Sequence, residues 1–253
     1  MLRCLFILCV LVVAVTAATV NVPCGAGADP AHCYEALQDA YDKAGSGDVL
    51  ELEDGIYAGG DDTMLTINKD VTLRAHNVKR AVLDGEFKRR VLNITKGVVV
   101  LDGLAITGGR VTGYNTPASE GGGMHVSGSA HVTVSLMDIY SNYAGYRGGG
   151  ICIGGFTGWA RLTIIGTNIF SNTADYGYGG GIFIDNNLST LVLSNTNIYS
   201  NTVHAHGGGI FSAPPSSPNI TNITADNQTA IFNNDREQCY GLTDAACGRQ
   251  PLV

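Results

Sequence analysis

The sequence has few charged residues and no cluster of basic ones. Lys and Arg number 15 against 22 Asp and Glu, and these four residue types make up 15% of 253 residues. Nucleic acids are bound by clustered Lys and Arg, so no nucleic-acid partner is expected. Seven prolines are too few for a proline-rich linker, and a hydrophobic content of 45% is too high for a disordered chain. The composition therefore indicates a folded protein of one large or two small domains.

Long hydrophobic runs are also missing, except at the N-terminus. Residues 5–15 form an apolar run that follows Arg3 and ends at the small residues 16–18. This arrangement is typical of a secretory signal peptide, and the run is shorter than the roughly 20 residues that span a membrane. We predict a signal peptide at residues 1–18, no transmembrane segment after its removal, and a secreted or cell-surface location.

The cysteines are few, and their spacing fits an oxidising compartment. Two of the seven lie in the predicted signal peptide. Cys24 and Cys33 form a near pair at one end, and Cys239 and Cys247 form another at the other end, so we expect two disulfides. Cys152 is left over. Five Asn-X-Ser/Thr sequons fit a secreted glycoprotein, and they begin at Asn93, Asn187, Asn219, Asn222 and Asn227.

Glycine is abundant, and its 34 residues are organised in a repeat. A Gly-Gly-Gly-apolar motif ends at Met124, Ile151, Ile182 and Ile210, with spacings of 27, 31 and 28 residues. A second motif, Ile-aromatic-Ser-Asn or a close variant, ends at Asn142, Asn172, Asn201 and Asn234, with spacings of 30, 29 and 33 residues. Two interleaved motifs with one shared period indicate a repeat protein.

The segments between these motifs read as short strands. Runs such as 151–153, 162–164 and 182–184 are β-branched or alternating and are bounded by glycine or asparagine. Stacked copies would bury one continuous core. We predict an all-β fold, a right-handed parallel β-helix over residues 19–235 with a short capping helix near 35–41, followed by a disulfide-tied tail at 236–253. A leucine-rich horseshoe lacks the required leucine spacing here, and a propeller lacks its hairpin turns.

Particular segments resemble known β-helix proteins. Residues 47–52, 55–57 and 82–85 resemble the opening of pectate-lyase-like proteins. The later repeats resemble the GG-x-I and F-x-x-N motifs of polymorphic outer membrane protein repeats, although isoleucine stands where that family has phenylalanine. These resemblances imply the fold. They leave the chemistry open, because such folds hold lyases, hydrolases, epimerases, adhesins and inert scaffolds.

Alternation along each strand predicts which side chains point into the coil. Ile151, Ile182 and Ile210 are expected inside, with His125, Cys152, Phe183 and Phe211 forming an outer row. A second outer row is expected from Tyr140, Phe170, Tyr199 and Phe232. We interpret the repeated asparagines as a structural ladder and the glycine triplets as tight turns, because no phosphate-binding lysine and helix follow them.

The search for catalytic patterns finds little. The repeats show no carboxylate cluster with ligand spacing, and the motifs of polygalacturonases are absent. Neither a metal site nor a cofactor is predicted. Stacking is expected to align Glu120, Arg147, Tyr178 and His206 on one corner ridge. Its plainest interpretation is a solvated ridge with a Glu120–Arg147 surface pair.

Two functions remain. The first is a non-catalytic secreted protein that binds glycans or contributes to adhesion or a surface coat. The alternative is a polysaccharide-active enzyme, a pectate-lyase-like lyase or a uronate epimerase. The expected partner is a polysaccharide or cell-surface glycan, neutral or weakly acidic, since the mature chain has a net charge of about −8. The predicted contact residues are Tyr140, Tyr146, Arg147, Phe170, Tyr176, Tyr178, Tyr199 and His206.

Overall fold

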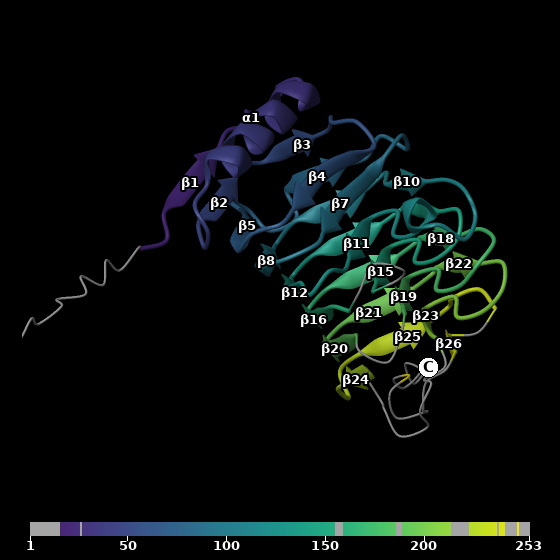
Figure 1. The fold of residues 1–253 in the computed structure, drawn as a ribbon. Helices are drawn as coiled ribbons and strands as arrows, with labels where there is room; N and C mark the ends of the chain where they lie inside the picture. The colour runs from purple at the N-terminus through teal and green to yellow at the C-terminus, as the bar shows by residue number, and fades with distance from the viewer. Residues whose placement is uncertain are drawn as a thin grey trace, which may run out of the picture.

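The computed structural model describes residues 16–25, 27–154, 159–185, 189–213, 223–236, 238–240 and 247. These residues form a right-handed parallel β-helix whose coils stack in chain order, from purple to yellow in Figure 1. Every strand pairing is parallel, as in the pairing of β12 (His131–Ser135) with β16 (Arg161–Ile165). The predicted fold class is confirmed.

Three sheets form the walls of the coil, and we name them A, B and C. Sheet A contains β1 (Thr19–Val22), β2 (Val49–Leu52), β5 (Val71–Ala75), β8 (Val98–Asp102), β12, β16, β20 (Thr190–Ser194) and β24 (Ile223–Ala225). Sheet B contains β3 (Gly55–Tyr57), β6 (Ala81–Asp84), β9 (Ala105–Thr107), β13 (Asp138–Tyr140), β17 (Asn168–Phe170), β21 (Asn197–Tyr199) and β25 (Ala230–Phe232). Sheet C contains β4 (Thr63–Ile67), β7 (Arg90–Ile94), β11 (Met124–Val126), β15 (Ile151–Ile153), β19 (Ile182–Ile184), β23 (Ile210–Ser212) and β26 (Cys239–Tyr240).

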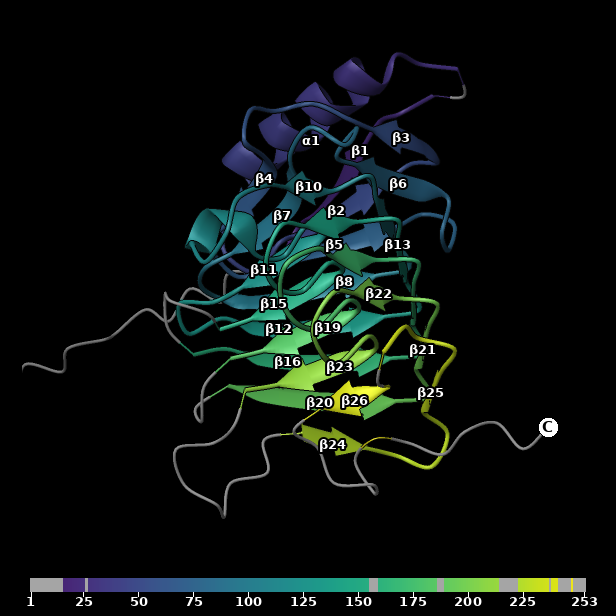
Figure 2. The same ribbon diagram turned by 90° about the vertical axis from the view of Figure 1, so that its right-hand side faces the viewer.

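A fourth, narrow sheet was not predicted. Sheet D contains β10 (Arg110–Val111), β14 (Tyr143–Ala144), β18 (Thr173–Ala174) and β22 (Thr202–Val203). In Figure 2 its labelled strands β10 and β22 face the viewer, with sheet C to their left and sheet B to their right. Strands of two residues carry no periodic pattern, so sequence patterns do not reveal them. Sheet D matters because the loops that follow it build the corner described below.

The capping helix is present and longer than predicted. Helix α1 runs from Pro30 to Lys43 and lies over the N-terminal end of the coil in Figure 1. Asp29 caps it by accepting a hydrogen bond from the backbone N–H of Ala31 over 3.0 Å. Leu37 and Tyr41 are buried on its inner face and join the main core, which closes the open first coil against water.

Side chains inside the coil follow the predicted alternation. Met124, Ile151, Ile182 and Ile210 pair in register along sheet C, and all four are fully buried. Ile139, Ile169 and Ile198 form a second buried row along sheet B. A row of like side chains stacks at the strand spacing and leaves no gap between coils.

Each of the three positions in a glycine triplet requires glycine for a different structural reason. Gly148 adopts φ +64°, a left-handed conformation that favours glycine. A Cβ on Gly149 would lie 2.4 Å from the Thr173 carbonyl oxygen of the next coil, and one on Gly150 would lie 2.7 Å from that of Gly181. The first glycine therefore makes the turn, while the next two let neighbouring coils approach at backbone contact distance.

The asparagines form a buried ladder, as predicted. Asn142, Asn172 and Asn201 each donate a side-chain hydrogen bond to the asparagine of the following coil and another to a backbone carbonyl. The asparagines are not, however, the left-handed residues of their turns. That conformation belongs to the preceding residue in each copy, with φ 53° at Ser141, 54° at Ser171, 54° at Ser200 and 52° at Asn233.

Both predicted disulfides are formed, between Cys24 and Cys33 and between Cys239 and Cys247, and Cys152 is a buried free thiol. Strand β26 pairs with β23, so sheet C extends into the segment expected to be a tail. Of the predicted signal peptide, residues 1–15 lie outside the described part, as do three sequon asparagines, Asn187, Asn219 and Asn222. Within the described residues, no helix has the length and apolarity needed to cross a membrane.

Candidate functional site at the corner between sheets D and C

The corner ridge is aligned as predicted. Glu120, Arg147, Tyr178 and His206 pair in parallel from coil to coil through isolated β-bridges. The first residue of this ridge, Glu120, is nevertheless not exposed to solvent as expected. Glu120 is fully buried, whereas His206 at the other end is exposed. The short 3₁₀ helix Pro117–Ser119 directly precedes Glu120. The expected surface pair of Glu120 and Arg147 is therefore a largely buried one.

The outer row of sheet C lies directly beneath this ridge. His125, Cys152, Phe183 and Phe211 occupy successive register positions. Their side chains lie outside the main core, as alternation predicts. They are nevertheless buried, since each residue is at most 6% exposed. Cys152, Phe183 and Phe211 form a second hydrophobic cluster against which Tyr178 packs. The corner loops thus cover the outward face of sheet C.

Arg147 is held on several sides. Its Nη1 lies 3.3 Å from Glu120 Oε1 and 3.9 Å from Asp185 Oδ2. Its Nη2 donates a hydrogen bond to the Tyr146 hydroxyl over 3.2 Å. The guanidinium carbon lies 4.4 Å from the centre of the Tyr146 ring and 4.7 Å from that of Phe183, within the range of cation–π attraction. This guanidinium is a structural tie between the ridge and the row beneath it.

The burial of Glu120, His125 and Cys152 shifts the pKa values of all three side chains. Desolvation raises the pKa of Glu120 to about 7, against the opposing effect of Arg147. Desolvation lowers the pKa of His125 to about 4, and the positive charge of Arg90 adds to this, so the imidazole is neutral at physiological pH. Burial and the nearby Glu120 raise the pKa of the Cys152 thiol, which donates weakly to Glu120 Oε2 over 3.8 Å.

A small pocket opens beside this cluster. It has a volume of about 330 Å³ and is lined by Arg90, Asn93, Pro117, His125 and neighbouring residues. Arg90 is buried, and its guanidinium donates to the carbonyl oxygens of Glu120 and Gly121, at distances from 2.7 to 3.3 Å. Arg90 therefore holds the loop that carries Glu120, and sequence reasoning missed this role.

Tyrosines line the outer side of the corner. Tyr114 and Tyr176 are each 63% exposed, and their ring centres lie 6.4 Å apart in an edge-on arrangement. Tyr114 also contacts Tyr146 at 4.8 Å, and Tyr146 contacts Tyr178 at 6.4 Å. We call Tyr114, Tyr146, Tyr176 and Tyr178 the tyrosine ridge. Its two most exposed members, Tyr114 and Tyr176, offer both apolar ring surface and a polar hydroxyl group.

The second outer row forms a stacked ladder on sheet B. The ring centres of Tyr140, Phe170, Tyr199 and Phe232 lie 5.1, 5.1 and 5.2 Å apart, with planes within 11° of parallel. Each ring face between two neighbours is covered, so mainly ring edges point outward. This geometry agrees with cross-coil stacking and leaves few open faces on which a sugar ring could stack.

The eight predicted contact residues therefore fall into two groups. Tyr140, Phe170 and Tyr199 belong to the ladder on sheet B. Tyr146, Arg147, Tyr176, Tyr178 and His206 belong to the corner, where ring contacts extend from Tyr114 to Tyr240. Among the described residues, ring contacts join members within each group and none joins the two groups. Tyr114, which the prediction left out, is part of the corner group.

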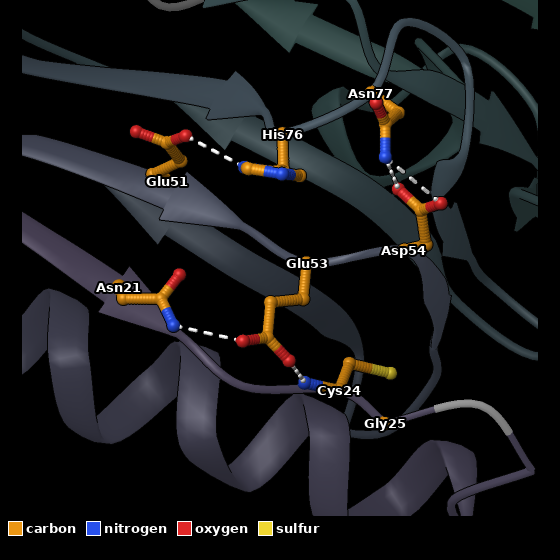
Figure 3. A pocket seen from close by; sticks show the side chains of 8 residues that line it. All are labelled: Asn21, Cys24, Gly25, Glu51, Glu53, Asp54, His76 and Asn77. Atoms are coloured by element: carbon orange, nitrogen blue, oxygen red, sulfur yellow. Dashed lines mark hydrogen bonds and ion pairs between the residues drawn. The ribbon is translucent and has the colours of Figure 1, made fainter.

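A larger pocket lies near the N-terminus, between β1, β2 and β5. It has a volume of about 590 Å³ and contains the carboxylates of Glu51, Glu53 and Asp54 (Figure 3). Each carboxylate already has partners. Glu51 accepts hydrogen bonds from Arg74 and His76, and both lower the pKa of Glu51. Glu53 accepts from Asn21 and from the backbone N–H of Cys24. Asp54 accepts from the side chain of Asn77. These pairs tie successive coils together, so we assign the pocket a structural role.

Neither a protein-family model nor a curated protein matches the sequence. Among solved structures, the chain is similar to a mutant of a PL6-family alginate lyase, with 15% identity and a TM-score of 0.44 over 93% of this chain and 39% of that one. It is also similar to the pectate lyase Pel9A, with 14% identity and a TM-score of 0.44 over 88% and 80% of the two chains. A third likeness is to an alginate lyase from Paenibacillus sp., with 15% identity and a TM-score of 0.33 over 84% and 99%. The chain thus spans 39% of the length of the first of these proteins, and identities this low concern the fold alone.

Proposed function

We propose that this protein is a secreted, non-catalytic β-helix protein that binds a polysaccharide or cell-surface glycan at the tyrosine ridge. The observation that carries the proposal is the pair of exposed, mutually contacting tyrosines, Tyr114 and Tyr176. Tyrosine rings pack against the C–H faces of sugars, and their hydroxyls exchange hydrogen bonds with sugar hydroxyls. Coils stack at about 4.8 Å, close to the length of one hexose, so a ridge along the coils can meet successive sugars.

The charge of the chain favours a neutral or weakly acidic glycan. The formal net charge of the whole chain is −7, and a long polyanion would be repelled at a distance. Arg147 lies beside the tyrosine ridge, and it already pairs with Glu120 and lies near Asp185. It supports the tyrosines from beneath, and in this proposal it does not bind the glycan directly.

The alternative function is a pectate-lyase-like lyase or a uronate epimerase. Such an enzyme needs a base beside the sugar C5 atom and a charge that neutralises the uronate. Arg147 already pairs with Glu120 and packs against the rings of Tyr146 and Phe183, so its guanidinium is engaged within the protein and poorly placed to act as that base. The non-catalytic reading is therefore the one we propose.

The proposal is tested by replacing the exposed rings. The double variant Tyr114→Ala/Tyr176→Ala and the parent protein are applied to a glycan array, and affinity for each bound glycan is then measured in solution. Two ring contacts at about 0.5–1.5 kcal/mol each predict a loss of affinity of about 5- to 150-fold. Trp159→Ala is the matched control. Trp159 is a partly exposed aromatic residue just before strand β16 of sheet A, and it contacts His131 rather than the tyrosine ridge.

The outcomes separate cleanly. Loss of binding in the double variant with retention in Trp159→Ala supports the ridge. Equal binding by the parent and the double variant, with matching circular dichroism spectra, removes the ridge from the glycan site. A parallel loss in Tyr140→Ala would place the contact on the ladder of sheet B instead.

A further inference from the structure

Three side chains of metal-binding type meet under the corner loops. Glu120 from the ridge, His125 from β11 and Cys152 from β15 each offer one ligand atom, and these atoms all lie within 4.8 Å of one another. All three residues are at most 4% exposed. We propose that these three residues bind one zinc ion, a role that does not depend on glycan binding.

The imidazole supplies the second, independent observation. His125 is buried, and its Nε2 atom makes no hydrogen bond of acceptable geometry, although the Gly154 backbone lies close enough to the ring to raise its pKa slightly against the effect of burial. A buried polar atom without a partner costs free energy, which a bound ligand would recover. Its other ring nitrogen, Nδ1, lies 3.4 Å from Asn93 Oδ1. Metal-binding histidines commonly use their second nitrogen in this way, with a side-chain or backbone oxygen that fixes the ring orientation.

The donor set selects the metal. A thiolate, an imidazole and a carboxylate suit zinc, whereas calcium and magnesium prefer oxygen ligands only. Tetrahedral zinc with bonds of about 2.1 Å to oxygen and 2.3 Å to sulfur separates those two ligand atoms by about 3.6 Å. Cys152 Sγ and Glu120 Oε2 are 3.8 Å apart, so this edge of the tetrahedron is nearly in place.

Two arginines, Arg90 and Arg147, lie near the cluster, so a dication must be neutralised by its own ligands. Glu120 directs Oε1 to Arg147 and Oε2 to Cys152, so one carboxylate oxygen is left for the ion while the other keeps its ion pair. Binding transfers the Cys152 proton to solvent as the zinc–sulfur bond forms. The resulting thiolate and the carboxylate then balance the two charges of the ion. Asp185 lies 3.9 Å from Arg147 and offsets the charge of that guanidinium.

The pocket beside His125 gives the site a route to solvent. Three protein ligands leave the fourth position of a tetrahedral zinc ion for water, which the pocket lined by Arg90, Asn93 and Pro117 can supply. Zinc would also fasten the loop that carries Glu120 to two coils of sheet C. The site further explains a reduced Cys152 in a chain with two disulfides, because a metal-bound thiolate is protected from oxidation.

The test uses the full secreted chain, freed of metal with a chelator and dialysed. Zinc chloride is titrated by calorimetry in two buffers of different ionisation enthalpy, and bound zinc is counted by elemental analysis. We expect one zinc per chain, with proton release on binding. Cobalt chloride serves as a spectroscopic probe, since a sulfur-to-cobalt charge-transfer band appears only if Cys152 is a ligand.

Three single variants identify the ligands: Cys152→Ser, His125→Gln and Glu120→Gln. Each should weaken zinc binding by about a hundredfold or more, because even an outer partner of a metal ligand is worth about 10- to 100-fold. Phe211→Leu is the matched control, since Phe211 lies in the same buried row and offers no ligand atom. It should bind zinc like the parent.

Two results would overturn the site. If the parent chain takes up no zinc at micromolar concentrations, the cluster is not a metal site. If Cys152→Ser and His125→Gln keep full affinity, the ion binds elsewhere. Circular dichroism identifies variants that fail to fold. For these, the cobalt spectrum of the parent still decides the question, because a spectrum without the sulfur band contradicts the proposal.

Discussion

The side-chain amide of Asn172 donates a hydrogen bond to the side-chain oxygen of Asn201 over 3.0 Å, one coil further along the helix. Asn172 also donates to the Ile139 carbonyl, and its own oxygen accepts from the backbone and side chain of Asn142. One buried side chain therefore satisfies polar groups of three coils, and no water is needed to do so.

Replacing Asn172 should be costly. Asn172→Ala removes the acceptor of the buried Asn142 backbone N–H and one partner of the Asn142 side-chain amide, so we expect the free energy of unfolding to fall by about 2–4 kcal/mol. Asn168→Ala is the control. Its hydrogen bonds to Asp138 and Asn197 are only partly buried, so water can replace them and the loss should stay below about 1 kcal/mol. Urea unfolding measures both, and equal losses would contradict a special role for the ladder.

The middle glycine of a triplet should tolerate no side chain. In Gly149→Ala, the added Cβ would lie 2.4 Å from the Thr173 carbonyl oxygen and 2.6 Å from that of Gly180, both rigid backbone atoms. We expect a loss of at least about 3 kcal/mol or failure to fold. Gly25→Ala meets nothing within 4 Å and should be neutral. Thermal unfolding of the two variants tests this, and a Gly149→Ala protein as stable as the parent would disprove the packing argument.

Stability should decrease in acid partly through Asp226. Hydrogen bonds from Ser194, the backbone of Asn195 and Thr229 lower the pKa of Asp226 to about 2, below its usual value of 3.8. A carboxyl group with a lowered pKa in the folded state stabilises the fold above its unfolded pKa, and this stabilisation is lost as pH falls toward 2. The parent should therefore be more stable than Asp226→Asn at pH 5, and the difference should shrink toward pH 2. Urea unfolding at the two pH values is the measurement, and a constant difference would contradict this assignment.

The proposed function predicts no lyase activity. Incubation with pectate, alginate and other uronate polysaccharides, with and without calcium, should give no ultraviolet absorbance from unsaturated products, because Arg147 is held in its ion pair. An active pectate lyase and an active alginate lyase, treated in parallel, show that these two substrates can be cleaved. Calcium-dependent absorbance from this protein would replace the non-catalytic proposal with the enzymatic alternative.

Much of the architecture could be predicted from the sequence, because each coil repeats the same contacts. The spacing of Ile151, Ile182 and Ile210 records the coil length, and the recurring asparagines mark the turn that they satisfy. Sheet D was missed because strands such as Tyr143–Ala144 span only one period of alternation, too few residues to show a pattern. The sequence did not indicate that Ser141 rather than Asn142 adopts the left-handed conformation, because both residue types tolerate turns and only the backbone shows which one adopts it.

The sequence by itself determined the coil period, the inward rows and the order of residues along the corner. Only the tertiary structure decided what covers the outward rows. Alternation tells whether Cys152 points out of the coil, but it does not tell whether a loop from another coil lies above it. The meeting of Glu120, His125 and Cys152 arises in the same way, since residues from different coils become neighbours only when the loop folds back over sheet C. Burial of that kind depends on the path of the loop in space, and local sequence patterns do not encode that path.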